Sequence, residues 1–234
     1  MLKIMSKFFL GLVLVGVVMV STAAAEIEVS GDAYVNISSM YLWRGFDLSN
    51  GDPVVQAGTD ISFNGFTLGF WGNYDIDTTN LNETNIVLDY TFDAGDLLSV
   101  SLGHILYALE DADGILTTGE VYAGVTFNTV LEPNLTLYYD YDEFDGDIFV
   151  TASVGHSVAV ADNLDLSIGA LASYMRSDAY NKLHNAEFSA GLDYALTDQV
   201  TLGASGIFST PISSQAKDAI DDEFMAGLTL TLSF

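Results

Sequence analysis

Apolar residues recur at every second position along most of this chain, in segments of roughly ten residues separated by Gly, Asn, Asp and Thr. The last segment shows the pattern most clearly, because one register is entirely apolar: Phe224, Ala226, Leu228, Leu230, Leu232 and Phe234. The positions between them are mostly polar or small. A period of two is typical of a β-strand with one apolar face, whereas an amphipathic helix repeats at 3.6 residues.

The same period predicts strands throughout the chain after residue 26. The twelve expected strands are residues 27–42, 53–63, 66–77, 83–93, 97–109, 119–128, 134–144, 148–160, 164–177, 185–196, 200–210 and 222–234. Connections at 64–65, 94–96, 129–133, 161–163 and 197–199 are short, and those between them are mostly longer and acidic, as at 43–52, 110–118, 178–184 and 211–221. Alternating short turns and longer loops predict an antiparallel up-and-down β-barrel.

Strand length and aromatic positions favour a barrel that crosses a membrane. A strand of about ten residues tilted near 45° rises roughly 23 Å, close to the apolar band of an outer-membrane barrel. On the apolar register, Phe63, Phe66, Phe92, Phe127, Tyr194 and Phe234 fall at the short-turn ends, and Tyr74, Tyr139, Tyr141, Tyr174, Phe208 and Phe224 at the long-loop ends. A soluble β-sandwich also alternates and is the other possibility. The two aromatic girdles favour an all-β transmembrane barrel of about 12 strands.

Residues 1–25 have the features of a secretory signal peptide. Lys3 and Lys7 form a basic start before an apolar run at residues 8–20, and Ala23-Ala24-Ala25 offers small residues for cleavage before Glu26. A retained membrane anchor is the alternative, but the run is short for a spanning helix. The expected organisation is a cleaved signal at 1–25 and a barrel over 26–234.

The composition excludes several other classes. With 50% hydrophobic residues, 12% aromatics and a mean hydropathy of +0.33, the chain is unlike a disordered acidic protein. Its 32 acids and 6 bases give a net charge of −26, so it would repel nucleic acid. The absence of cysteine excludes disulfides, thiol catalysis and Cys-based zinc sites.

The opening hairpins resemble a known family. Residues 38–75 carry Trp43-Arg44-Gly45-Phe46, then Pro53-Val54-Val55-Gln56, then Gly69-Phe70-Trp71-Gly72. This block resembles the start of the TorF-type porin family of bacteria, also called Gcw_chp. The resemblance implies an outer-membrane barrel of porin type across the whole mature chain, and it brings no settled substrate and no catalytic residues.

If the apolar register faces lipid, the opposite register lines the interior and is rich in acids. The pore-lining candidates are Asp32, Asp60, Asp89, Asp140, Glu187 and Asp193, of which Asp60, Asp89, Glu187 and Asp193 are expected near mid-barrel. Twelve strands leave a bore of roughly 10 Å after side chains. Carboxylates around such a bore concentrate cations and repel anions, unless they serve only to solvate the interior.

Two arginines stand out because bases are scarce. Arg44 follows the first strand and Arg176 ends the ninth, so both are expected at the pore rim on the long-loop side. Two alternatives are open for each. Either it folds inward and pairs with lining acids, which would narrow the mouth, or it extends toward headgroups or lipopolysaccharide phosphates.

Catalytic and metal chemistry has little support in the sequence. His104 and His156 fall on the apolar register, where a polar side chain facing lipid is costly, so a bulge that turns each toward the lumen is the simplest account. Ser157 beside His156 is on the opposite face, which does not suit a lipid-face hydrolase. Acidic strings at 111–114 and 142–147 suit Ca²⁺ but do not complete an EF-hand pattern. No catalytic residue, metal site or cofactor is predicted.

The sequence as a whole predicts a channel in the bacterial outer membrane for passive diffusion of small hydrophilic solutes, acid-lined and cation-preferring. The alternative is a closed structural or surface-binding barrel with acidic, ion-binding loops. The expected partners are outer-membrane lipid, lipopolysaccharide and small solutes or cations. An oligomer is compatible with the sequence, because a subunit seam and a lipid face use the same residue types.

Overall fold

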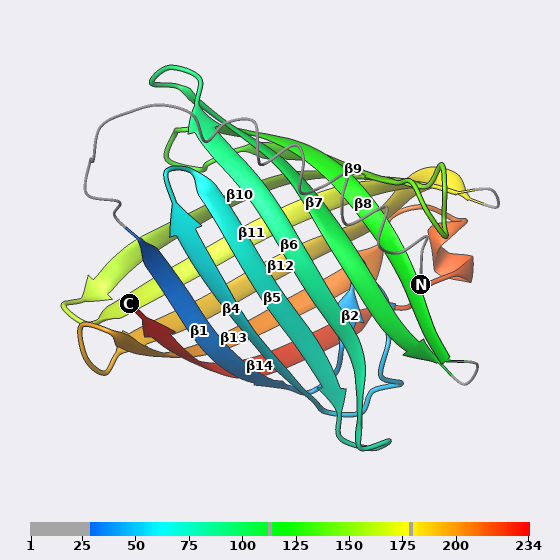
Figure 1. Ribbon diagram of the computed structural model, residues 1–234, viewed down its shortest axis with the longest axis horizontal. Coiled ribbons are helices and arrows are strands. Elements are labelled where there is room, and N and C mark those ends of the chain that lie inside the picture. Colours follow the sequence, from blue (N-terminus) through cyan, green and yellow to red (C-terminus); the bar gives the residue numbers. More distant parts are fainter. Residues whose placement is uncertain (1–28, 112–113, 178–179) are drawn as a thin grey trace, which may run out of the picture.

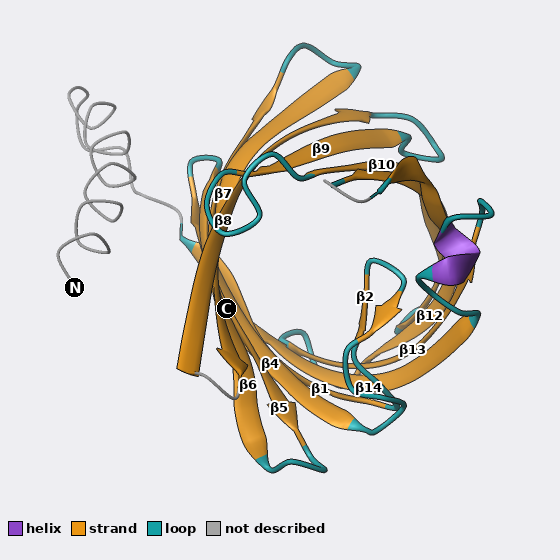
Figure 2. Cartoon of the chain, turned by 90° about the vertical axis from the view of Figure 1, so that its right-hand side faces the viewer, coloured by secondary structure: helices purple, strands orange, loops and turns teal. Residues whose placement is uncertain are grey.

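The computed structural model describes residues 29–111, 114–177 and 180–234, and within them twelve strands form one closed antiparallel barrel (Figures 1 and 2). In chain order they are β1 (Ser30–Ser38), β4 (Val54–Phe63), β5 (Phe66–Asp75), β6 (Asn80–Asp93), β7 (Leu98–Asp111), β8 (Gly114–Phe127), β9 (Asn134–Asp140), β10 (Ile148–Ala161), β11 (Leu164–Arg176), β12 (Asn181–Ala195), β13 (Val200–Pro211) and β14 (Glu223–Ser233). Each strand pairs with its neighbour in sequence, and β1 closes the barrel by pairing with both β4 and β14. The predicted fold is confirmed.

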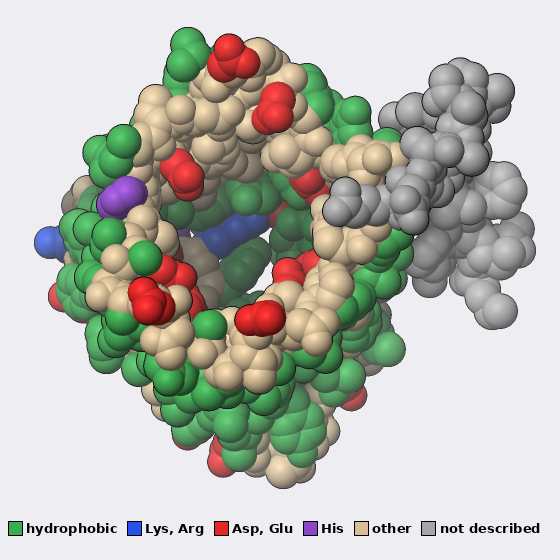
Figure 3. All heavy atoms as spheres, turned by 90° about the vertical axis from the view of Figure 1, so that its left-hand side faces the viewer, with side chains coloured by type: hydrophobic (Ala, Val, Ile, Leu, Met, Phe, Trp, Pro, Cys, Tyr) green, Lys and Arg blue, Asp and Glu red, His purple; other side chains and the backbone are tan. Residues whose placement is uncertain are grey.

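Alternation along the strands sorts their side chains onto two faces of the wall. The apolar register of β14 is exposed, with Phe224 63% and Leu228 58% accessible. The opposite register of the neighbouring strands carries polar groups such as Asn36, which lies across from Gln56 and Thr229. Figure 3 shows hydrophobic side chains over the outside of the barrel and acidic ones around its opening. The interior is therefore a polar lumen rather than a packed apolar core.

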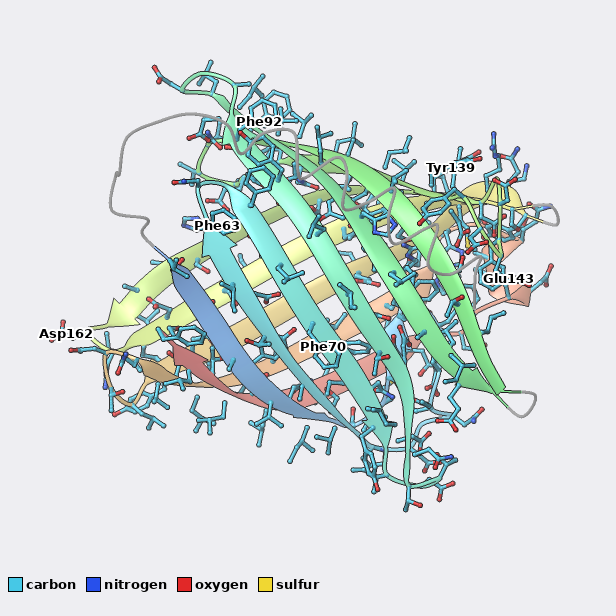
Figure 4. The ribbon with its side chains drawn as sticks, in the orientation of Figure 1. Phe63, Phe70, Phe92, Tyr139, Glu143 and Asp162 are labelled. Carbon is cyan, nitrogen blue, oxygen red and sulfur yellow. The ribbon has the colours of Figure 1, made fainter. Side chains whose placement is uncertain are left out.

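Aromatic rings gather toward the ends of the outer face. At the short-turn end Phe66 lies between Phe63 and Tyr90, with ring centroids 5.8 and 4.4 Å away, and Tyr90 continues to Phe92 at 5.6 Å. Figure 4 shows Phe63 and Phe92 toward this end and Tyr139 toward the other. Girdles of aromatic rings at both ends of the outer face suit the two interfaces of a membrane.

Several strand boundaries differ from the sequence prediction. The predicted strand 27–42 ends at Ser38, and the predicted strand 134–144 ends at Asp140. There the Asp140 carboxylate accepts hydrogen bonds from the backbone N–H groups of Asp142 and Phe144, which turns the chain.

Two connections predicted to be long are largely strand. β7 and β8 pair as far as Asp111 opposite Gly114, and β12 begins at Asn181 instead of after residue 184. Both extensions mix polar and apolar residues, because strand pairing satisfies the backbone groups of a residue whether or not its side chain is apolar.

The predicted signal peptide at residues 1–25, Asp113 of the first acidic loop string, and Asp178 lie outside the described residues. In the part of the chain that is described, there is no helix of sufficient length and hydrophobicity to span a membrane.

Candidate functional site

The loop between β1 and β4 folds into the barrel instead of away from it (Figure 2). Within this loop, β2 (Leu42–Trp43) and β3 (Phe46–Asp47) form a small hairpin, which we call the inner hairpin (residues 39–53). Its turn consists of Arg44 and Gly45, both with positive φ, at 52° and 84°. Positive φ at both central residues is the geometry of a tight two-residue turn that suits the twist of a hairpin. The turn brings Arg44 to the tip.

Arg44 extends from this tip to the opposite wall. Its guanidinium donates two parallel hydrogen bonds to Glu120 on β8, at 2.8 and 2.7 Å, and the two side chains are only 12% and 8% exposed. The same guanidinium lies over the rings of Trp43, Tyr138 and Phe149, at 4.4, 5.0 and 4.4 Å from their centroids. A forked ion pair with aromatic rings around it is a strong, directional contact. The inner hairpin and Arg44 together span the lumen.

Two further contacts anchor the inner hairpin to other strands. The buried Tyr41 hydroxyl donates to Glu83 on β6 at 2.8 Å, and burial together with the nearby Glu83 charge raises the pKa of Tyr41, so the phenol stays protonated. On β12, fully buried His184 donates from Nε2 to the Arg44 carbonyl at 2.9 Å, and its Nδ1 accepts from Tyr180 at 3.2 Å. The hairpin is thus fastened to several sides of the barrel.

A cavity of about 350 Å³ lies beside the Arg44–Glu120 pair. Most of its wall is apolar, with contributions from the inner hairpin and from β7, β10 and β11, and four carboxylates border it. The apolar lining includes Trp43, Phe46, Leu48, Tyr107, Leu109, Phe144, Ile148, Phe149 and Met175, and the carboxylates are Glu83, Glu120, Asp140 and Asp147. The narrow part of the lumen therefore combines negative charge with apolar surface.

The six acids proposed to line the pore all fall on the polar register of the wall. Three of them belong to carboxylate pairs directly opposite each other on neighbouring strands: Asp32 lies across from Asp60, and Asp193 lies across from Asp165. Asp89 accepts a hydrogen bond from Tyr122 at 2.7 Å. These residues lie in the short-turn half of their strands. Asp60 and Asp89 are near the middle of β4 and β6, whereas Asp193 lies near the end of β12, so the expectation of a mid-barrel position was wrong for Asp193.

The remaining two acids lie closer to the inner hairpin. Glu187 accepts from Asn185 at 2.9 Å on the same strand. Asp140 accepts from Thr118 at 2.6 Å and is only 3% exposed, because the turn after β9 folds over it. Asp140 therefore shapes the wall and contributes charge without an open carboxylate surface.

Arg176 and the outward histidines are placed elsewhere. Arg176 is exposed at the end of β11 and donates to the Gly146 carbonyl at 3.0 Å, so the structure does not bring it to the lining acids. His104 pairs with Leu88 and Val121, and His156 with Ile168, in regular ladders on the outward register. The expected bulges were wrong, because the ladder stays regular at both positions. His104 Nε2 meets the Tyr141 hydroxyl at 2.5 Å, which satisfies its polar edge.

The described residues contain no group of three or more His, Asp or Glu arranged to hold a metal ion. Aspartates of the acidic string at 142–147 make hydrogen bonds within the loop and to the adjacent strand. For example, Asp145 accepts a hydrogen bond from the Tyr139 hydroxyl at 2.9 Å.

Sequence reasoning missed Tyr107, Tyr138, Phe149 and His184 as parts of this site. Tyr138 carried a usable signal, because it is an aromatic residue on the otherwise polar register of β9, whereas Tyr107 shares its register with Ile105 and Leu109. His184 was expected in a loop, and only the tertiary structure brings it to the Arg44 carbonyl, 140 residues away in sequence.

The comparisons with known proteins agree with this architecture. Residues 21–217 match the family described as "Bacterial protein of unknown function (Gcw_chp)". The chain belongs to this family. The match extends well beyond the opening block at 38–75, so the Gcw_chp assignment covers most of the barrel. No curated protein matches the chain.

Among solved structures, this Gcw_chp barrel is similar to the NanC porin, with 13% identity, a TM-score of 0.57, and coverage of 86% of this chain and 98% of that one. It is also similar to the KdgM porin, with 12% identity, a TM-score of 0.56, and coverage of 88% and 99%. A KdgM porin in complex with disordered oligogalacturonate matches at 12% identity, a TM-score of 0.53, and coverage of 88% and 98%. Identities this low show the fold alone. The barrel resembles bacterial outer-membrane porins, which supports the outer membrane as its location.

Proposed function

We propose that this Gcw_chp protein is a porin-like outer-membrane channel for passive diffusion of small solutes, acid-lined and cation-preferring. The observation that carries the proposal is the opposition of like charges on the lumen face, Asp32 across from Asp60 and Asp165 across from Asp193. Directly opposite residues of an antiparallel pair have Cβ atoms about 4.5–5.5 Å apart, and like charges there destabilise the sheet. A passing cation relieves that repulsion, whereas an anion increases it.

The basic charge that enters the lumen does not offset these pairs. Arg44 is committed to Glu120 through both of its terminal nitrogens, so its charge is neutralised where it lies. The aspartate pairs are on other strands toward the short-turn end, and Figure 3 shows acidic side chains around that opening. Solutes entering from this end meet negative potential first. In this proposal, solute passage depends on the width of the bore and on its electrostatic potential, and it involves no chemical step.

The test is the reversal potential of the refolded protein in a planar bilayer under a salt gradient. Asp60→Asn with Asp193→Asn should move a cation-selective reversal potential toward zero, because one carboxylate of each opposed pair is neutralised. The matched control is Asp162→Asn with Asp198→Asn, which removes the same charge from turns outside the barrel strands (Figure 4 shows Asp162). An unchanged potential in the lumen variant, or an equal shift in the control, contradicts the role of these acids.

One observation favours the second candidate, a closed barrel. The inner hairpin and Arg44 span the lumen and are anchored on β6, β8 and β12. A barrel that refolds to a heat-modifiable form but passes no current under any voltage would support a structural or binding role instead of a channel.

A further inference from the structure

The Arg44 guanidinium lies in a site whose other parts belong to the barrel wall. Glu120 accepts both of its hydrogen bonds, and Tyr138 and Phe149 present their rings to it. The Tyr107 hydroxyl donates to the same Glu120 carboxylate at 2.8 Å. These four wall residues, which we call the Glu120 site, come from four consecutive barrel strands, β7 to β10. The barrel ladder therefore holds them in position whether or not the inner hairpin is present.

The chemistry of the Glu120 site is specific for a planar cation. A carboxylate that accepts two parallel hydrogen bonds matches the fork of a guanidinium, and an ammonium group has no such fork. Ring faces add attraction for a delocalised cation that sheds its water easily. Glu120 is only 8% exposed, and a buried carboxylate without a partner is costly, so the site demands a cation.

We propose that the Glu120 site binds small guanidinium-bearing solutes, and that Arg44 occupies it as an internal substitute until such a solute displaces it. The proposal deepens the proposed channel function and rests on it, because the solute reaches the site through the lumen. It names alkylguanidinium cations as a preferred class among the cations that the acidic lumen admits.

The neighbouring cavity supplies room for the rest of such a solute. Its volume of about 350 Å³ and its apolar lining, which includes Phe46, Leu48 and Met175, suit a short alkyl chain attached to the guanidinium. Glu83 and Asp140 on the same border disfavour a chain that ends in a carboxylate. The combination selects an alkyl chain that is neutral or positively charged at its far end.

The inner hairpin is built so that Arg44 can be displaced. Arg44 is not glycine, yet its φ is 52°, a backbone conformation that costs free energy. This strain is relieved when Arg44 leaves Glu120 and the turn changes conformation. A tethered competitor acts at an effective concentration on the order of millimolar or more, so a free solute binds the wild-type site weakly. Weak binding is what passage through a channel requires.

The experiment measures binding of ethylguanidinium to the refolded barrel in detergent, by fluorescence of Trp43 and Trp71 and by thermal unfolding. Arg44→Ala removes the internal competitor and leaves the Glu120 site intact. We expect it to bind ethylguanidinium about tenfold or more tightly than wild type. The double variant Arg44→Ala with Glu120→Gln should lose this gain, and ethylammonium should not reproduce it.

Arg176→Ala is the matched control. It removes a rim arginine whose guanidinium donates to a backbone carbonyl and not to a carboxylate. It should bind ethylguanidinium no better than wild type. Equal affinity of Arg44→Ala and the double variant, or equal affinity for ethylammonium, overturns the proposal. If Arg44→Ala refolds poorly, the refolding yield becomes the readout: rescue by ethylguanidinium supports the site, and lack of rescue contradicts it.

Conductance recorded on the same samples separates this proposal from the channel function. If the barrel binds ethylguanidinium but passes no current, the binding proposal is supported and the channel proposal is contradicted. If the barrel conducts cations selectively but does not bind ethylguanidinium, the channel proposal is supported and the binding proposal is contradicted.

Discussion

Gly45 fixes how closely the inner hairpin approaches β12. Its φ is 84°, and a Cβ at this position would lie 2.9 Å from Ile220 Cδ1 and 3.0 Å from Asn185 Nδ2. The turn therefore needs glycine for two separate reasons, backbone conformation and space. Arg44 beside it also has a positive φ without being glycine, and its ion pair with Glu120 offsets the free-energy cost of that conformation.

Gly45→Ala should lower the free energy of unfolding by about 2–3 kcal/mol, from left-handed strain and the clash together. Urea titration of the refolded barrel measures this loss. Gly51→Ala is the matched control, because Gly51 also has a positive φ, 79°, but nothing lies near its added Cβ. Its loss should be about 1 kcal/mol, from strain alone. Equal losses would mean that the crowding at Gly45 has no energetic weight.

Secondary-structure elements divide into a wall that folds by pairing and a hairpin held by side chains. The ladder between β1 and β4 is already complete where Ser38 meets Val54, at the two ends of the inner hairpin. The hairpin contributes Tyr41–Glu83 and Arg44–Glu120 contacts, but no strand pairing to the barrel. At the base of the hairpin, the Ser39 N–H donates to the Ala226 carbonyl of β14 at 2.8 Å and so extends the closing ladder. Barrel closure is therefore expected to be independent of residues 40–52.

Replacement of residues 40–52 by a short Gly-Ser linker should leave a heat-modifiable barrel and raise single-channel conductance by about twofold or more, because the lumen loses the element that spans it. Gel mobility before and after heating verifies the fold, and bilayer recording gives the conductance. A folded variant with wild-type conductance would show that the hairpin does not limit flow.

For the molecule as a whole, the two faces of the wall face different solvents. Ile168 on β11 is 58% exposed on the apolar outer face, and Ser167 next to it lies opposite Ser157 and Gly191 on the lumen register. Lipid accepts an apolar side chain and penalises a charge, whereas a wet lumen tolerates a charge.

Ile168→Lys should therefore cost about 2–4 kcal/mol of unfolding free energy in lipid vesicles, and Ser167→Lys much less. Both variants add the same lysine to adjacent positions of one strand, so each controls for the other. Denaturant titration of the folded barrel in vesicles provides the comparison. A larger loss at position 167 would reverse the assignment of the two faces.

The sequence by itself determined the strand period, the twelve segments and the face on which each residue lies. The reason is local, because alternation along an extended chain assigns side chains to faces without knowledge of any partner. The opposition of Asp32 with Asp60, and of Asp165 with Asp193, came from the structure. β1 and β4 are joined by the inner hairpin, and β11 and β12 by a connection on the same side of the barrel, whereas a tight turn such as Asn64-Gly65 joins β4 to β5. Strand ends were less certain, since polar residues extend β7, β8 and β12 as readily as apolar ones.

Only the tertiary structure decided what happens inside the barrel. Whether Arg44 reached lipid headgroups or a lining acid depended on the direction of the inner hairpin, which no periodicity encodes. That direction follows from contacts between residues distant in sequence: Arg44 with Glu120, and its carbonyl with His184. Local pattern fixes a wall because its hydrogen bonds follow chain order, whereas a loop takes its place from whichever side chains the closed barrel brings within reach.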